Sequence, residues 1–250
     1  MLLNWSGGSA SGWSGRVLEP EWLECAGPAH ADRNLCELAR INRWFGGHRA
    51  LLRMMKDLVD PAEHFSVLDV GAGSGDIGKC LTRHFRNAKV VSLDHRPVHL
   101  RNAPSPQVVA DALQLPFSKH AFDFVLCSSV LHHFPDCEVV DMISTLRQFA
   151  RRALLLLELE RRPLAYHFLP LTRRILGWGP LTVHDGSVSV AAAFRLEELV
   201  SLARAAGAEV AIGRRHRPWF RVFVVVPAGS PDPADRQMAS VANDSYMALR

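Results

Sequence analysis

The sequence lacks the cysteine spacing of disulfide-bonded and zinc-binding proteins. Its five cysteines include no C-x-x-C pair, and their odd number leaves at least one without a partner in the chain. Unpaired thiols are typical of a reducing compartment. We therefore expect a cytoplasmic protein with reduced cysteines and no metal site.

Segments for export or membrane insertion are also missing. The first residues, MLLNWSGGSASGWSG, have neither the basic start nor the sustained apolar centre of a secretory signal. No run of about 18 uninterrupted apolar residues occurs, so we expect no transmembrane segment. The formal net charge is only +4, and the arginines form short pairs rather than a long stripe, which disfavours a nucleic-acid partner.

The composition is that of a folded domain with loose ends. The 250 residues are 48% apolar, which is enough for one large α/β core. Residues 1–18 are rich in glycine and serine, and residues 228–250 are polar and punctuated by proline. Because neither end carries apolar periodicity, we expect two flexible tails around one domain at 19–227. Removing the tails should barely change the melting temperature.

The most informative stretch is VLDVGAGSG at 67–75. An apolar strand runs into an acidic residue and then into three alternating glycines at the start of a helix. Glycines at this spacing allow a tight turn and a close approach to a ligand, while the helix points free N–H groups at it. The stretch predicts a nucleotide-type ligand site.

Charge indicates which nucleotide is bound. Residues 73–78 also fit the dinucleotide fingerprint G-x-G-x-x-G, with Asp94 near the expected ribose distance, so an NAD-type oxidoreductase is an alternative. A pyrophosphate here would lie close to Asp69 and Asp76, and like charges in a partly dry pocket repel by several kcal/mol. S-adenosylmethionine carries an ammonium, a sulfonium and no phosphate. The local charge therefore favours S-adenosylmethionine.

Polar residues follow the next apolar strands. The strand at 89–93 ends in Asp94, whose carboxylate could accept hydrogen bonds from both hydroxyls of a ribose. The strand at 107–110 ends in Asp111 and Ala112, where a side-chain acceptor and a backbone N–H could read the amino edge of adenine. We expect these groups to converge on one rim of a parallel sheet.

With these motifs in order, the chain resembles the class I S-adenosylmethionine-dependent methyltransferases. It is most similar to the small-molecule branch that includes the ubiquinone and menaquinone biosynthesis C-methyltransferases. The resemblance covers about residues 35–226. It rests on VLDVGAGSG at 67–75, VVSLD at 90–94, ADALQLPF at 110–117 and FDFVLCSSVLHHF at 122–134.

The resemblance implies an α/β fold. We expect a seven-stranded, doubly wound, Rossmann-like sheet with an antiparallel last strand, preceded by a helical cover at 19–60. The cofactor would lie across the carboxyl ends of the strands. A non-catalytic S-adenosylmethionine-binding module is the other alternative. From motifs and resemblance together we expect the cofactor to contact Asp69, Gly71, Ala72, Gly73, Gly75, Asp94, His95, Asp111, Ala112, Ser128 and His133.

Periodicity predicts the remaining elements. Residues 34–59 show helical spacing broken at Gly46-Gly47, which predicts two helices meeting at a bend. Further helices are expected over 75–85, 139–150 and 196–206, and further strands over 122–127, 153–157, 209–212 and 220–226.

Arg43, before this bend, has two interpretations. In related small-molecule methyltransferases the segment ahead of the first strand folds over the methionine end of the cofactor. Arg43 would then bind the cofactor carboxylate through a charge-assisted bond. Alternatively, Arg43 is solvated and the segment only packs on the core.

Residues 161–193 form an insertion that mixes apolar and basic residues around Pro170. We expect a lid over an apolar acceptor, because long insertions in compact domains are usually functional. An amphipathic segment on a membrane surface and plain packing over the sheet are the alternatives. The lid favours a small hydrophobic methyl acceptor, aromatic or polyketide-like.

Histidines are the candidates for a general base. His184 precedes Asp185 in the insertion, and a carboxylate beside an imidazole raises its basicity. His133 follows the fourth strand, although one histidine of the His132-His133 pair is expected to order that loop. Tyr166 and His167 are weaker candidates. The sequence does not separate O- from C-methylation, while the absence of an Asn/Asp-Pro-Pro-aromatic tetrad after residue 127 disfavours nucleic-acid methylation.

Overall fold

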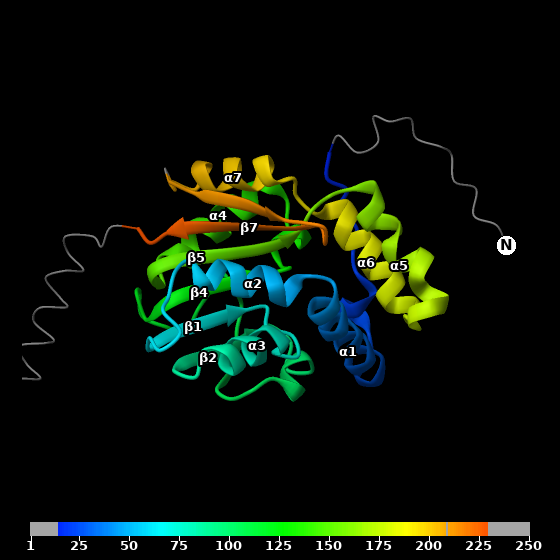
Figure 1. Ribbon diagram of the computed structural model, residues 1–250, viewed down its shortest axis with the longest axis horizontal. Helices are drawn as coiled ribbons and strands as arrows, with labels where there is room; N and C mark the ends of the chain where they lie inside the picture. The colour runs from blue at the N-terminus through cyan, green and yellow to red at the C-terminus, as the bar shows by residue number, and fades with distance from the viewer. Residues whose placement is uncertain (1–14, 209, 230–250) are drawn as a thin grey trace, which may run out of the picture.

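The computed structural model describes residues 15–208 and 210–229. One seven-stranded sheet forms its centre, in the order β3-β2-β1-β4-β5-β7-β6 (Figure 1). The pairs among β1 to β5 are parallel, whereas β7 runs antiparallel to both of its neighbours. This confirms the expected sheet. The strands are β1 Phe65–Val70, β2 Ala88–Asp94, β3 Gln107–Val109, β4 Phe122–Ser128, β5 Ala150–Leu159, β6 Ile212–His216 and β7 Arg221–Pro227.

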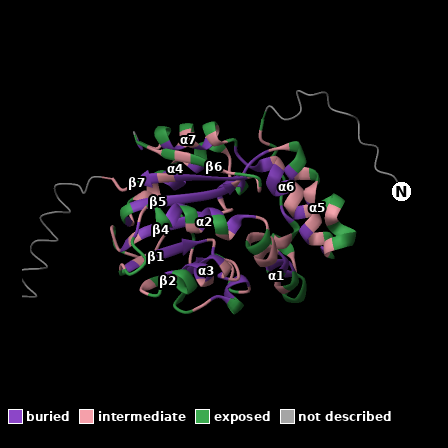
Figure 2. Cartoon of the chain, viewed as in Figure 1, coloured by how far each residue is buried: buried purple, intermediate pink, exposed green. Residues whose placement is uncertain are grey.

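Helices cover both faces of the sheet, as a doubly wound fold requires. On one face α2 (Gly47–Lys56) and α3 (Asp76–His84) bury Leu51 and Leu81 with Phe124 of β4. On the other, α4 (Asp136–Arg147) and α7 (Leu196–Ala205) bury Met142 and Leu199 with Leu156 of β5. Each such side chain contributes roughly 1.5–3 kcal/mol by leaving water. Figure 2 shows buried strands between helices with exposed outer faces.

A third group of helices lies at one end of the sheet (Figure 1). It consists of α1 (Pro28–Trp44), α5 (Pro163–Leu176) and α6 (Pro180–Ala192). Short 3-10 helices accompany it, η2 at Trp22–Cys25, η3 at His99–Asn102 and η4 at Leu131–His133. This group stands over the carboxyl ends of the parallel strands, where open α/β sheets bind their ligands.

The bend between α1 and α2 is where the sequence predicts it. Gly46 has a φ of +85°, and a Cβ there would lie 2.5 Å from the Cβ of Trp219. Only glycine fits both the left-handed backbone and this close approach. The glycine therefore brings the end of α1 against the loop that precedes β7.

Two predicted boundaries are wrong. The strand expected over 209–212 begins only at Ile212, and residue 209 lies outside the described residues. Val210 and Ile212 are 65% and 53% exposed, so their apolar run did not indicate a buried strand. The helix expected over 139–150 ends at Arg147, and Ala150 already begins β5.

The predicted tail boundary at residue 18 is also wrong. The Arg16 side chain is only 9% exposed. It donates hydrogen bonds to the carbonyl oxygens of Ala192 (2.7 Å) and Phe134 (2.8 Å), and its guanidinium lies 4.0 Å from the centre of the Phe194 ring. Residues 15–18 therefore belong to the folded domain, and the rest of that predicted tail, like the part of the other tail at 230–250, lies outside the described residues.

None of the helices described here combines the length and hydropathy that crossing a bilayer requires. The cysteines of the described part are free thiols, of which Cys80 and Cys127 are buried. A cytoplasmic location stays a prediction.

Candidate functional site

The glycine loop between β1 and α3 forms the floor of the site. Gly71 has a φ of +70°, and a Cβ there would lie 2.2 Å from Cγ2 of Val130. The backbone N–H of Gly73 donates a 3.0 Å hydrogen bond to Oδ2 of Asp94. The glycine loop therefore contacts the loop after β4 through Gly71 and the end of β2 through Gly73.

Asp94 organises the neighbouring rim. Its Oδ1 accepts the backbone N–H of Arg96 at 3.0 Å and lies 3.3 Å from Nδ1 of His99. Burial alone would raise the pKa of Asp94, but the hydrogen bonds and charge of these partners outweigh it and hold the pKa below the usual range. Asp94 is therefore an ionised acceptor, and His95 stands beside it with Nδ1 3.5 Å from Oδ1.

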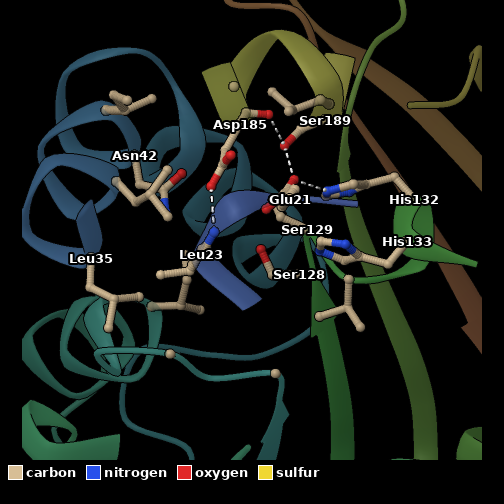
Figure 3. Close-up of a pocket in the computed structure, with 18 of the residues that line it drawn as sticks. Glu21, Leu23, Leu35, Asn42, Ser128, Ser129, His132, His133, Asp185 and Ser189 are labelled. Carbon is tan, nitrogen blue, oxygen red and sulfur yellow. Dashed lines mark hydrogen bonds and ion pairs between the residues drawn. The ribbon is translucent and has the colours of Figure 1, made fainter. Parts of the chain in front are cut away.

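A cavity of about 900 Å³ opens over this rim. Its walls come from the carboxyl ends of the strands, from α1, from η4 and from the helix pair α5 and α6 (Figure 3). Most of the residues predicted to contact the cofactor line this cavity: Asp69, Gly71, Ala72, Gly73, Asp94, His95, Asp111, Ala112, Ser128 and His133. Gly75 is not among the lining residues but caps α3 with a left-handed backbone.

Two further acidic side chains, Asp69 and Asp76, lie at the rim. Asp69 is fully buried, and burial followed by the charges of Asp76 and Asp94 raises its pKa to about 8. Asp76 lies 2.9 Å from Nε2 of His48 and accepts a hydrogen bond from Nδ2 of Asn42 at 3.2 Å. Asp69 is therefore mostly protonated at pH 7, and the negative charge that favours a cationic ligand comes from Asp94 and Asp76.

A buried charge cluster anchors the loop after β4. Glu158, at the end of β5, accepts the backbone N–H groups of Val130 and Leu131 at 2.9 Å and lies 2.8 Å from Nδ1 of His132. Nε2 of His132 lies 3.5 Å from Glu21 (Figure 3). Burial alone would lower the pKa of His132, but both carboxylates raise it to about 9. His132 is therefore a structural imidazolium, as expected for one member of the pair.

His133 presents a different environment. Its side chain is 29% exposed and lines the cavity (Figure 3). Its Nδ1 lies 3.7 Å from Oε1 of Glu24. Burial and the adjacent positive charge of His132 lower its pKa below the usual value. His133 is thus a neutral imidazole at pH 7 that faces the ligand space.

The structure does not bring Arg43 to the site. Arg43 is exposed and does not line the cavity, because it lies on the outer side of the last turn of α1. Its neighbour Asn42 lines the cavity instead. This position corrects the expected contact between Arg43 and a cofactor carboxylate.

His184, the other predicted catalytic base, also lies outside the cavity. The predicted pair exists, with Nδ1 of His184 2.9 Å from Oδ1 of Asp185. The ring, however, stacks on Trp22 with centroids 3.7 Å apart and does not line the cavity. Asp185 faces inward and accepts the backbone N–H groups of Trp22 and Leu23 at 2.9 Å (Figure 3). The pair fastens the N-terminal segment to α6.

The insertion contributes the apolar wall opposite the rim. From α5 and α6 the cavity is lined by Leu164, Ala165, Phe168, Leu169, Asp185, Gly186, Ser189 and Val190. The opposite side of α5 exposes Leu171 (73%) and Ile175 (84%).

Sequence reasoning missed three buried residues of the site, Glu21, Glu158 and Arg221. Glu158 directly follows an apolar strand, the same signal that indicated Asp94, so it could have been found. Glu21 and Arg221 are brought in from the two ends of the domain, and no local pattern marks them. Donor atoms of Glu21, His132 and His133 lie within 4.8 Å of one another, close enough to consider a cation where no metal site was expected.

Comparison with known proteins finds a family match over part of the chain. A methyltransferase-domain family matches residues 68–153. Over 68 residues the chain is 44% identical to a curated malonyl-[acyl-carrier protein] O-methyltransferase from Herminiimonas arsenicoxydans, a match that covers 26% of each chain.

Two solved structures show the same fold. Human N-acetylserotonin methyltransferase in complex with S-adenosylmethionine has a TM-score of 0.59 and 15% identity, with 82% of this chain and 57% of that chain covered. Magnesium protoporphyrin IX methyltransferase from Synechocystis with bound S-adenosylhomocysteine has a TM-score of 0.50 and 20% identity, with 74% and 84% covered. The chain therefore spans about a quarter of its curated relative and under two thirds of the human structure.

The residues present fit S-adenosylmethionine. Gly71 and Gly73 line the cavity without side chains, so the glycine loop presents its backbone there, and a side chain at position 71 would collide with Val130. Asp94 offers an ionised acceptor, and Asp69 keeps one carboxylate oxygen without a hydrogen-bond partner among the described residues. Such a surface suits a ribose and a cationic amino-acid end, whereas it would repel a pyrophosphate.

Proposed function

Because this chain is a class I S-adenosylmethionine-dependent methyltransferase by its fold and its family match, we propose that it methylates a small hydrophobic acceptor. One observation carries this proposal. The cofactor rim and the apolar wall of α5 and α6 line the same cavity of about 900 Å³. This volume is near the upper end of ligand pockets, which are roughly 300–1,000 Å³, and suits two ligands side by side.

The apolar wall supports an aromatic or polyketide-like acceptor. Phe168 and Leu169 of α5 and Val190 of α6 offer side chains without charge, and an acceptor held against them loses its contact with water. The α5 and α6 pair would then act as the lid, with Leu164 at its edge, since this side chain lines the cavity while 64% exposed.

His133 is the proposed general base. When bound, the cofactor supplies a methyl group on a cationic sulfur, which is already an activated electrophile. The protein then has to align the acceptor, exclude water and accept a proton. His133 is neutral, faces the cavity and can take the proton of a phenol or enol at one ring nitrogen, with Glu24 3.7 Å from Nδ1.

The N-terminal segment closes the site beside this base. Asp185 accepts the backbone N–H groups of Trp22 and Leu23, and Ser189 donates a hydrogen bond to Glu21. Leu23 and Glu24 line the cavity. This segment would keep water from the transferring methyl group.

The relatives are named for different methyl acceptors, so the acceptor proposed for this chain follows from its own residues. One is a malonyl-[acyl-carrier protein] O-methyltransferase, one acts on N-acetylserotonin and one on magnesium protoporphyrin IX. Their acceptors differ in size and charge. The proposed use of a phenol or enol as acceptor therefore rests on His133, and the proposed small-molecule rather than nucleic-acid acceptor rests on the apolar wall.

A methyl-transfer assay tests the proposal. The purified chain is incubated with S-adenosylmethionine and, in turn, phenolic, quinone-like and polyketide-like acceptors, and acceptor-dependent S-adenosylhomocysteine is measured. We expect turnover with at least one apolar hydroxyl-bearing acceptor. Binding of S-adenosylmethionine without turnover on any acceptor would favour a non-catalytic binding module.

A further inference from the structure

Arg221 is a buried cation whose charge is not neutralised. It begins β7, lines the cavity and is 5% exposed. Its Nη2 donates a 3.0 Å hydrogen bond to Oδ1 of Asn42, but its Nε has no hydrogen-bond partner in the described part of the chain. Burial lowers its pKa to about 10, and the more distant charges of Glu158 and Asp76 offset this only in part.

A buried arginine in this state is unusual. Removing a guanidinium from water costs several kcal/mol unless a carboxylate and full hydrogen bonding compensate for it. None of the ion pairs within 4.0 Å among residues 15–208 and 210–229 involves Arg221. The guanidinium therefore has unused capacity for an anion at the cavity wall.

The position of Arg221 relates it to the glycine loop. Asn42 bridges the two, because its Oδ1 accepts from Arg221 while its Nδ2 donates to Asp76, the first residue of α3. Phe220 precedes Arg221 with a left-handed φ of +51°, and both side chains line the cavity. The turn before β7 thus delivers a cation to the end of the cavity beside the start of α3.

We propose that Arg221, positioned by Asn42, binds the carboxylate at the amino-acid end of the cofactor, an inference that rests on the proposed cofactor. Among the described residues that line the cavity, Arg221 is the one lysine or arginine. His48 is already paired with Asp76, and Arg43 points to solvent. The guanidinium fork matches a carboxylate with two parallel N–H donors.

The surrounding charges favour an amino acid over a phosphate. Asp76 also lines the cavity and is linked to Arg221 through Asn42, so the same end of the cavity offers a carboxylate for an ammonium group. A zwitterion satisfies both groups at once. A phosphate would satisfy Arg221 but would be repelled by the charges of Asp76 and Asp94.

Two ligands that differ only in the amino-acid end provide the test. S-Adenosylhomocysteine carries the α-carboxylate and α-amino group, whereas methylthioadenosine has the same thioether nucleoside without them. Calorimetric affinities are measured for the parent, Arg221→Gln, Arg221→Lys and the control Arg43→Gln. We expect Arg221→Gln to lose at least about ten-fold in affinity for S-adenosylhomocysteine, with methylthioadenosine unchanged, and Arg221→Lys to lose less.

The ratio of the two affinities within each variant separates binding from folding, since partial unfolding weakens both ligands together. An unchanged ratio in Arg221→Gln, or an equal change in Arg43→Gln, would overturn the assignment. A parent protein that binds both ligands equally well would do the same while leaving the proposed cofactor intact. A parent that binds neither ligand would contradict the proposed function itself.

Discussion

Nδ1 of His132 lies 2.8 Å from Oε2 of Glu158, and the other oxygen of Glu158 accepts the backbone N–H groups of Val130 and Leu131. One buried carboxylate therefore fixes both the loop after β4 and the ring of His132. Burial and the positive charge of His132 both lower the pKa of His133, so this neighbour is neutral at pH 7. The loop thus presents an unprotonated imidazole to the cavity.

Replacement of His133 tests this arrangement. His133→Ala should lower turnover by roughly 100-fold or more while the affinity for S-adenosylhomocysteine stays close to that of the parent, because a general base typically contributes 10²–10⁴-fold. His184→Ala is the matched control, since this ring lies outside the cavity against Trp22. The parent rate should be flat near pH 7 and fall below the lowered pKa of His133. A fully active His133→Ala would exclude the proposed base.

Metal removal distinguishes a base from a metal ligand. Glu21 and His132 already form an ion pair with each other, which leaves them no role as metal ligands. We therefore expect turnover to stay within about two-fold after treatment with EDTA and desalting. A metal-dependent site would lose most of its rate. Loss of activity that Zn²⁺ restores would instead identify Glu21, His132 and His133 as ligands. The measurement is turnover before and after chelation, with metal content determined in parallel.

Stability should decline at alkaline pH. The pKa of His132 is raised from its usual 6.5 to about 9, so the native state holds this proton more tightly than the unfolded chain. Its contribution is fully present below about pH 6.5 and is lost as the pH rises through about 9. Asp69 and His48, raised to about 8 and about 9, act in the same direction. Melting temperature should therefore fall between pH 6.5 and 9, and less steeply in His132→Gln.

Arg16 should matter for stability although it lies in a segment that reads as a tail. Arg16→Ala removes part-buried hydrogen bonds to two backbone carbonyl groups, and hydrogen bonds from charged groups are worth about 1.5–3 kcal/mol. In a domain of this size about 1 kcal/mol shifts the melting temperature by roughly 2–4 °C. Arg101→Ala, an exposed arginine 3.9 Å from Asp32, is the control. Equal melting temperatures for both variants would place Arg16 outside the cooperative core.

The parts of the site that lie within continuous sequence motifs were predictable from the sequence. The glycine loop, Asp69 and Asp94 belong to contiguous strand-loop-helix motifs, so their convergence on one rim follows from the parallel sheet. The pairing of His184 with Asp185 was predictable too. Which of the two side chains faces the cavity was not predictable. Adjacent helical residues point about 100° apart, and Trp22, on which His184 stacks, is 162 positions away in the sequence.

The charged residues that complete the site depend on the tertiary fold. Arg43 is in the expected helix, but one position on that helix decides whether a side chain meets the cavity or solvent. Arg221 reaches the same cavity from β7, and its partner Asn42 is 179 residues away. No periodicity or motif links two such positions before the chain is folded.

Calorimetric titration of the full chain with S-adenosylhomocysteine and, separately, with NAD tests the central claim most directly. The negative charges of Asp76 and Asp94 at the rim should admit the first ligand and repel the pyrophosphate of the second. We expect saturable binding of one S-adenosylhomocysteine per chain and no measurable heat with NAD. Tight binding of NAD together with no binding of S-adenosylhomocysteine would contradict the account.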